Sequence, residues 1–502
     1  MADISFNSQS NSETAQRVIQ NYINGEWLPS SGTETVDIIN PATGEQIGLC
    51  PLGTAGDVDT AVAAAKQAFV SWRQTPVIDR VQPLFRLKTL FEDAAEDLAR
   101  QVTIEHGKTL VEARGSVRRG IQMIETACGM PSLLMGDIQE DIAAGIDSQS
   151  INRPMGVFAC IAPFNFPAMV PMWFWPFAVA CGNTYVLKPS ERVPLTQLMM
   201  FDLLKDAGFP DGVVNMVHGA HDVVNAICTH PDIQGVSFVG STPVARHVYE
   251  TGCAAGKRVQ ALGGAKNFML VLPDAVMDKA AATATESIIG CAGERCLAGS
   301  VIVNIGAGTL DKIQPLVIRE AESIRVGNGL ADDVDMGPVI SAEAKARITG
   351  LIERALEDGA ELLVDGRVGV EDSPGYFLKP TVLGKIRPDM EIAQVEVFGP
   401  VILLAETDTF DDAIEWINNS PFANTATLFT TSGAAARQFS HEAAPTMLGI
   451  NIGVPAPMAF FSFGGAKDSF FGDIRAHGSA SVDFFTNSCV TIQRWTKDSS
   501  IW

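Results

Sequence analysis

An α/β fold built around parallel β-sheets is the class that this sequence predicts, and its composition and strand pattern carry the prediction. The chain has 502 residues, of which 46% are hydrophobic and 19% are charged, as is usual for a soluble globular protein with large cores. Its middle alternates short β-rich runs with helical stretches, which implies a parallel sheet covered on both faces. The length exceeds one typical domain, so we expect two or three.

Five β-rich runs make up the predicted first sheet. In chain order they cover residues 156–163, 184–190, 213–219, 235–241 and 258–264. Ligands of such sheets bind at the carboxyl ends of the strands. The residues that follow these runs are therefore expected to border a ligand site.

Helical stretches separate these runs. Residues 168–181 are strongly apolar but too few to span a bilayer, and they carry two prolines, so we expect a buried helix there. An amphipathic helix is predicted over residues 194–210, closed by a glycine and a proline. A short helix ending at His230 and another beginning near Pro243 complete the pattern.

A second α/β segment is predicted after Lys266. It holds Cys296 early and the motif EVFGP at Glu396–Pro400. Two other pieces, residues 150–157 and 481–495, have the pattern of separate extended strands. Edge strands of this kind often join subunits.

Charge and cysteine usage exclude several classes of protein. The chain carries 36 Lys+Arg against 58 Asp+Glu, a net charge of −22, which argues against nucleic acid or an anionic membrane as a partner. The 9 cysteines are scattered with no C-x-x-C pair, and the N-terminal stretch lacks an apolar signal core, so we expect a reduced, cytoplasmic protein. The 7 histidines form no H-E-x-x-H motif, and no metal is expected.

Cys296 has the surroundings of a reactive cysteine. Arg295 precedes it, and the small residues 298–300 leave room for a second molecule. A nearby cation favours the thiolate, which is the nucleophilic form. The alternative is a packing role, because free cysteine is among the most buried residue types.

Polar residues follow the predicted strands and fit a nucleotide ligand. Lys188 and Glu191 could bond the two hydroxyls of an adenosine ribose, or form a surface salt bridge. Gly240 and Ser241 lie at a strand-to-helix turn that suits a phosphate, although a plain tight turn explains them equally well. Asn165, within PFNFP, could donate to a developing oxyanion or serve as a turn residue. The usual G-x-G-x-x-G fingerprint is absent.

Taken in order, six motifs resemble those of the aldehyde dehydrogenase superfamily across nearly the whole chain. The motifs are PFNFP, LKPSE, FVGST, LGG, GERC and EVFGP. Within the superfamily, ALGGAKN, GERC and residues 453–473 are most similar to the CoA-acylating methylmalonate-semialdehyde and malonate-semialdehyde dehydrogenases. The resemblance implies NAD as cofactor, CoA as co-substrate, and a homodimer or homotetramer.

The resemblance also implies a division into domains. A Rossmann-type NAD-binding domain would comprise residues 18–138 and 156–266. Residues 267–478 would form an α/β catalytic domain, and residues 139–155 and 479–502 a small β oligomerisation arm.

By the same resemblance, Cys296 would be the nucleophile and Asn165 the oxyanion donor. Arg119 and Arg295 would bind the substrate carboxylate, since a guanidinium binds carboxylate bidentately; for Arg119 the alternative is a solvated helix face. The residues expected to bind the cofactor are Ala162, Phe164, Lys188, Glu191, Arg192, Ser241, Gly263, Glu396 and Phe398.

One departure from the wider superfamily bears on the reaction. Hydrolytic members commonly read ELGG, where the glutamate activates water, whereas this chain has Ala261 there. Release of the acyl group to CoA is therefore expected, because the CoA thiol ionises far more readily than water. Two alternatives stay open: a hydrolytic dehydrogenase with Glu294 or Glu396 as a relocated base, and a catalytically silent NAD-binding or structural protein. The variant stretches CLAGS and MWFWP, and Ala466, leave the acyl substrate open.

Overall fold

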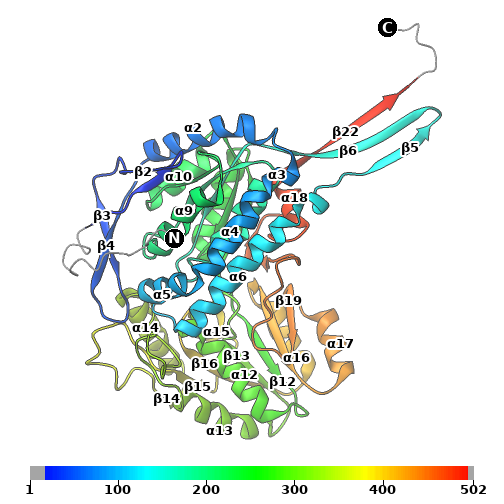
Figure 1. Ribbon diagram of the computed structural model, residues 1–502. Helices are drawn as coiled ribbons and strands as arrows, with labels where there is room; N and C mark the ends of the chain where they lie inside the picture. Colours follow the sequence, from blue (N-terminus) through cyan, green and yellow to red (C-terminus); the bar gives the residue numbers. More distant parts are fainter. Residues whose placement is uncertain (1–16, 496–502) are drawn as a thin grey trace.

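The computed structural model describes residues 17–495, which form two α/β layers and a projecting arm (Figure 1). Each layer is one β-sheet together with the helices that cover it. The first layer is an eight-stranded sheet in the order β2-β1-β9-β8-β7-β10-β11-β21. Its bounds in that order are Glu26–Leu28, Asn21–Ile23, Val214–Met216, Thr184–Lys188, Val157–Ile161, Ile233–Val239, Arg258–Leu262 and Phe470–Phe471. Five neighbouring strands, β9-β8-β7-β10-β11, are mutually parallel, which confirms the five predicted runs.

Alternating side chains along these strands explain why both faces of the sheet are covered. In β7, Phe158 and Cys160 face one core, while Ala159 and Ile161 face another. Helices pack on each side. On the first side lie α4 (Gln82–Asp93), α6 (Leu110–Cys128), α8 (Trp175–Ala180) and α9 (Leu195–Ala207). On the second lie α2 (Ala55–Trp72), α10 (His221–Thr229) and α11 (Thr242–Ala254).

The apolar stretch over residues 168–181 is buried as predicted, but it is not one helix. A 3₁₀ helix, η1 (Val170–Trp173), is followed by α8, and Phe174 between them has non-helical dihedrals. Both pieces carry a proline in their first turn, where its missing N–H costs nothing. Each proline therefore lies near the start of a separate short helix.

A second sheet of seven strands follows along the chain, in the order β14-β15-β16-β13-β12-β18-β19. All neighbours are parallel except β14, which is antiparallel to β15. The bounds in that order are Glu361–Val364, Thr381–Gly384, Val401–Thr407, Val301–Ile305, Phe268–Val271, Thr425–Phe429 and Met447–Ile450. The main helices of this layer are α12 (Met277–Ile289), α13 (Thr309–Glu322), α14 (Ala342–Glu357), α16 (Phe410–Asn419) and α17 (Gly433–Glu442).

One strand from the later part of the chain returns to the first sheet. β21 follows the second sheet in sequence, yet it pairs antiparallel with β11 at the edge of the first sheet. Nine further elements belong to the described chain. They are β3 (Thr35–Ile39), β4 (Gln46–Pro51), α3 (Val77–Arg80), α5 (Ala95–His106), α7 (Met130–Leu133), α15 (Glu391–Gln394), β17 (Phe422–Ala423), β20 (Ala466–Lys467) and α18 (Ala480–Phe485).

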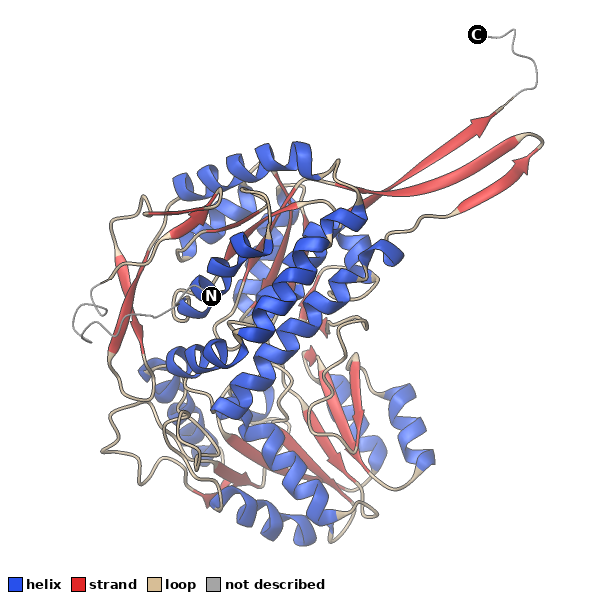
Figure 2. Ribbon diagram, in the orientation of Figure 1, coloured by secondary structure: helices blue, strands red, loops and turns tan. Residues whose placement is uncertain are grey.

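A three-stranded antiparallel arm projects from the helix-covered body (Figure 2). It consists of β5 (Ile138–Ala143), β6 (Ile146–Pro154) and β22 (Thr486–Arg494). Asn183 fixes its base, because the side chain accepts from two backbone N–H groups before β7 and donates to the carbonyl of Phe485. Residues 496–502 of the expected arm lie outside the described residues.

Candidate active site

Cys296 lies in the loop between α12 and β13. The loop begins with a 3₁₀ turn over Gly290–Gly293, in which Cys291 and Ala292 have positive φ values of 55° and 53°. Gly293 has φ +75°, and a Cβ there would overlap the carbonyl oxygen of Gly399. The GERC and EVFGP motifs are therefore in backbone contact, which requires the glycine.

Two asparagines hold the backbone of Cys296. The amide nitrogens of Asn267 and Asn424 each donate to its carbonyl oxygen, both at 2.9 Å. Asn267 follows directly after the LGGAK stretch, and Asn424 lies just before β18. Neither was among the residues expected from the sequence. For Asn267, the only indication in the sequence was its place at the end of the run ALGGAKN.

Burial governs the protonation of the Cys296 thiol. The pKa is raised to about 12: desolvation is the largest cause, the charge of Glu396 acts in the same direction, and Arg295 acts against both. The expected influence of Arg295 therefore has the right direction, but burial outweighs it in the ligand-free protein. The raised pKa favours the thiol over the thiolate, so attack requires that the proton be removed first.

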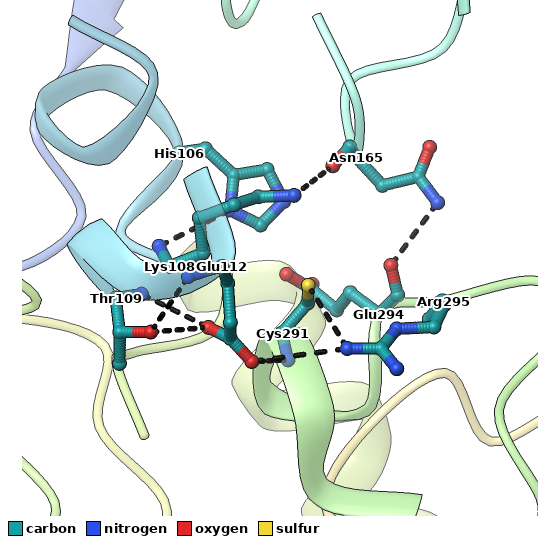
Figure 3. A network of polar contacts seen from close by, with 8 residues as sticks. All are labelled: His106, Lys108, Thr109, Glu112, Asn165, Cys291, Glu294 and Arg295. Carbon is teal, nitrogen blue, oxygen red and sulfur yellow. Dashed lines mark hydrogen bonds and ion pairs between the residues drawn. The ribbon is translucent and has the colours of Figure 1, made fainter. Parts of the chain in front are cut away.

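Asn165 is joined to the same loop (Figure 3). Its side-chain amide donates to the carbonyl of Glu294 at 3.0 Å, two residues before Cys296. Its own carbonyl accepts from the buried ammonium of Lys108 at 2.6 Å, and that ammonium lies 3.8 Å from the ring centroid of Phe166. Because a primary amide has two N–H groups, one remains for a ligand.

Glu112 and Arg295 form the other half of this network (Figure 3). Glu112 accepts from the backbone N–H of Cys291 at 2.6 Å and from the N-cap residue of its own helix, Thr109. It lies 3.8 Å from Arg295, which also approaches the sulfur of Cys291 at 3.6 Å. Glu112 was not expected from the sequence; the only signal was its place three residues after Thr109, which is typical of a capping box.

A cavity of about 300 Å³ brings Cys296 together with both expected carboxylate-binding arginines. Arg119 and Arg295 line it with Cys296, and most of its other walls are apolar. Arg118, by contrast, is exposed and pairs with Glu92 at 3.1 Å, so the solvated-face reading applies to Arg118 and not to its neighbour. Arg119 also donates to the carbonyl of Pro457 at 2.8 Å.

The expected ribose ligands lie at the carboxyl end of β8. Lys188 and Glu191 are 2.8 Å apart, and Lys188 is almost fully buried. Burial opposes ionisation of Glu191, but the charge and hydrogen bond of Lys188 outweigh it and lower the pKa of the carboxyl. The backbone N–H of Ala162 donates to the carbonyl of Lys188 at 2.9 Å, which joins two of the expected cofactor positions. Arg192 turns instead toward Glu343, at 3.7 Å.

The turn after β10 meets the LGG motif. Ser241 is the exposed N-cap residue of α11, and its hydroxyl makes no capping hydrogen bond. Thr242 accepts from the N–H of Gly264 at 2.9 Å, and a Cβ on Gly263 would lie 2.7 Å from the carbonyl of Asp468. A hydroxyl without a capping bond at the start of a 13-residue helix fits the phosphates of a dinucleotide.

Glu396 and two aromatic rings border the opposite wall. Glu396 accepts from the N–H of Ala265 at 3.0 Å, and burial raises its pKa to about 7. Phe164 and Phe398 are packed edge to face, with ring centroids 5.9 Å apart. PFNFP is thus in contact with EVFGP, and Glu396 of EVFGP bonds the residue that follows the LGG motif.

No carboxylate stands at position 261. Ala261 is fully buried in β11, between Phe238 of β10 and Phe471 of β21. Among the described residues that line the 300 Å³ cavity, Glu112 is the only carboxylate, and its oxygens are already bonded to Cys291 and Thr109. Glu294 is buried elsewhere, accepting from Ile340, with a pKa raised by burial to about 8.

The chain belongs to the aldehyde dehydrogenase family, whose model matches residues 27–490. Among curated relatives it is similar to malonate-semialdehyde dehydrogenase 2 of Geobacillus kaustophilus, 47% identical over 96% of this chain and 100% of that protein. Malonate-semialdehyde dehydrogenase 2 of Bacillus thuringiensis is 48% identical over 97% and 99% of the two chains.

Solved structures of methylmalonate-semialdehyde dehydrogenases have the same fold as this chain. The structure of a methylmalonate-semialdehyde dehydrogenase from Oceanimonas doudoroffii has a TM-score of 0.94 at 41% identity, covering 96% of this chain and 99% of that one. The NAD complex of a protein from Sinorhizobium meliloti, whose assignment as a methylmalonate-semialdehyde dehydrogenase is itself inferred, has a TM-score of 0.95 at 39% identity. It covers 96% of this chain and 99% of that one. Within residues 17–495, no helix is long and apolar enough to cross a membrane.

Proposed function

We propose that this protein is an NAD-dependent, CoA-acylating dehydrogenase of malonate or methylmalonate semialdehyde. The observation that carries the proposal is the shared cavity of Cys296, Arg119 and Arg295. A nucleophile and two guanidinium groups in one small cavity suit an aldehyde whose other end is a carboxylate. The similarity to malonate- and methylmalonate-semialdehyde dehydrogenases supports the same substrate class.

In this proposal Cys296, once deprotonated, attacks the aldehyde carbon. Asn165 and the backbone N–H of Cys296 donate to the resulting oxyanion, while Arg119 and Arg295 hold the carboxylate. NAD, bound at the strand ends, would accept the hydride from the former aldehyde carbon. Loss of that hydride leaves a thioester on Cys296. Lys188 and Glu191 hold the adenosine ribose, Ser241 lies at the phosphates, and Glu396 holds the nicotinamide ribose. Ala162, Phe164, Arg192, Gly263 and Phe398 complete the proposed cofactor cleft.

Release of the acyl group follows from Ala261. A methyl group cannot take a proton from water, so the thioester waits for the thiol of CoA. Loss of carbon dioxide before that transfer gives acetyl-CoA from malonate semialdehyde and propionyl-CoA from methylmalonate semialdehyde. Neither Glu294 nor Glu396 is among the described residues that line the cavity of Cys296, which argues against the hydrolytic alternative.

The proposal extends to assembly and location. The division into an NAD-binding domain (18–138 and 156–266), a catalytic domain (267–478) and an arm (139–155 and 479–502) remains our working description. Exposed apolar residues on β22, including Val490 and Ile492, support a role for the arm in a homodimer or homotetramer. Nine free cysteines suit a cytoplasmic enzyme whose nucleophile must stay reduced.

A panel of short aldehydes, assayed with NAD in the presence and absence of CoA, tests the proposal. We expect malonate or methylmalonate semialdehyde to have the highest kcat/KM and to yield acetyl-CoA or propionyl-CoA, identified by mass. A preference for uncharged aldehydes such as propanal would contradict the substrate class. A lack of NADH formation from every aldehyde would favour the catalytically silent alternative.

A further inference from the structure

The cavity that contains Cys296 has polar groups that the proposed reaction leaves unexplained. Trp173, at the end of η1, and His477, in the loop before α18, both line it. Their side chains are buried, His477 with 1% of its surface exposed. Neither the indole N–H nor either imidazole nitrogen has a hydrogen-bond partner among the described residues. Because burying such groups unpaired is costly, their retention beside a cavity points to a ligand.

The two rings form one unit. Their centroids are 5.0 Å apart with an interplanar angle of 82°, an edge-to-face contact, and Phe463 packs against both rings. Neighbouring backbone bonds fix the loop: Phe463 and Ala476 exchange hydrogen bonds of 2.8 and 3.0 Å, and the N–H of Gly478 donates to Ala459 at 3.1 Å.

The backbone of His477 is held in an unfavourable conformation. Its φ of +73° lies in the left-handed region, which costs a non-glycine residue free energy and persists only where the surroundings impose it. The bonds on both sides of His477 supply that constraint. Strain of this kind, at a side chain that lines the nucleophile's cavity, is typical of residues kept for binding.

The charge state of His477 limits what it can bind. Burial, and then the charge of Arg119, lower its pKa to about 3, so the imidazole is neutral at pH 7 and carries one ring N–H. The indole of Trp173 is a donor only. Arg119 also bonds a backbone carbonyl and Arg295 also contacts Glu112, so the two arginines do not turn all their donors to the ligand. Two neutral ring donors therefore match the remaining acceptor positions of a carboxylate, which has about four.

We propose that the ring N–H groups of His477 and Trp173 donate hydrogen bonds to the distal carboxylate of the bound semialdehyde, completing a subsite whose charge comes from Arg119 and Arg295. The inference rests on the proposed function and adds two residues to its specificity. The two arginines supply charge to any anion, whereas the two fixed rings set the position of the carboxylate relative to Cys296. Aldehydes without a carboxylate leave both donors unpaired in an apolar cavity and are disfavoured.

The test compares selectivity, defined as kcat/KM for malonate semialdehyde divided by kcat/KM for propanal. His477→Gly removes one donor while accepting the positive φ, and Trp173→Phe removes the other N–H with the five-membered ring that carries it, keeping an aromatic ring at the position. Each substitution should lower the selectivity about ten- to hundredfold, mainly through KM for the semialdehyde, as expected for a lost hydrogen bond to a charged group. His477→Asn keeps an amide donor and tolerates a positive φ, so its selectivity should lie between those of wild type and His477→Gly.

The outcomes separate this inference from the proposed function. If the wild type does not prefer malonate semialdehyde to propanal, the proposed function fails and the subsite fails with it. If the wild type has the preference but either His477→Gly or Trp173→Phe, as folded protein, reduces both kcat/KM values equally, the two-donor subsite is wrong. Should His477→Gly not fold, Trp173→Phe decides alone, because an apolar aromatic ring still fills most of the space and the backbone is unchanged.

Discussion

Replacing Asn165 with alanine separates the contribution of this residue to catalysis from its contribution to stability. The side-chain amide makes one hydrogen bond in the free protein, to the carbonyl of Glu294 at 3.0 Å. The stronger bond, from Lys108 at 2.6 Å, is made to the backbone carbonyl of Asn165 and survives the substitution. Asn165→Ala should therefore lower the free energy of unfolding by only about 1 kcal/mol, the net value of an ordinary hydrogen bond.

The effect on the reaction should be much larger. Removing one oxyanion donor typically costs about 10²–10³ in rate, or roughly 2.7–4 kcal/mol of activation free energy. The assay is a single-turnover measurement of NADH absorbance with enzyme in excess over the semialdehyde and NAD saturating. The expected result is a rate constant lower by about 10²–10³, with NAD binding unchanged.

Asn304 in β13 provides a matched control. It is as buried as Asn165, and its amide donates to the carbonyl of Ala405 at 3.0 Å, within the second sheet and away from the cavity. Asn304→Ala should lower stability by a similar ~1 kcal/mol and leave the single-turnover rate intact. If Asn165→Ala reacted within about threefold of wild type, or no more slowly than Asn304→Ala, Asn165 would not be the oxyanion donor.

Three further predictions follow from the same site. Cys296→Ala should abolish NADH formation and keep NAD binding, whereas Cys291→Ala should stay active; the reverse pattern would reassign the nucleophile. NAD should exceed NADP in kcat/KM by at least about tenfold, because Glu191 would repel a 2′-phosphate, and comparable values would remove Glu191 from the ribose site. Burial raises the pKa of Glu294 from 4.5 to about 8, so its stabilising effect is full below pH 4.5 and is lost as pH rises through 8. Glu294→Gln should therefore reduce the fall in unfolding free energy over that range, measured in urea, and an unchanged fall would contradict the shift.

The sequence was informative where strands end. The alternation of β-rich and helical runs predicted the five parallel strands, and residues such as Asn165 and Ser241 follow the carboxyl ends of β7 and β10 as expected. Those residues follow short, strongly patterned elements, whose order alone brings them to one edge of the sheet. The break at Phe174 was missed, because the apolar character of residues 168–181 is the same whether they form one helix or two.

Residues that act through long-range contacts could not be predicted in this way. His477 and Trp173 are separated by some 300 positions, and only packing brings their rings to 5.0 Å. Asn424 bonds the carbonyl of Cys296 from a loop that carries no recognisable motif. The influence of Arg295 on Cys296 was given the correct direction, but the larger effect of burial depends on how the loop packs and is not encoded in the neighbouring residues.

The identity of the released product tests the central claim most directly. With malonate semialdehyde, NAD and saturating CoA, the account predicts acetyl-CoA as the main product, because Ala261 provides no base for water. Without CoA, NADH formation should slow after the first turnover, since general-base assistance worth about 10²–10⁴-fold is missing from hydrolysis. A free carboxylic acid as the main product at saturating CoA would contradict the acylating assignment and favour the hydrolytic alternative.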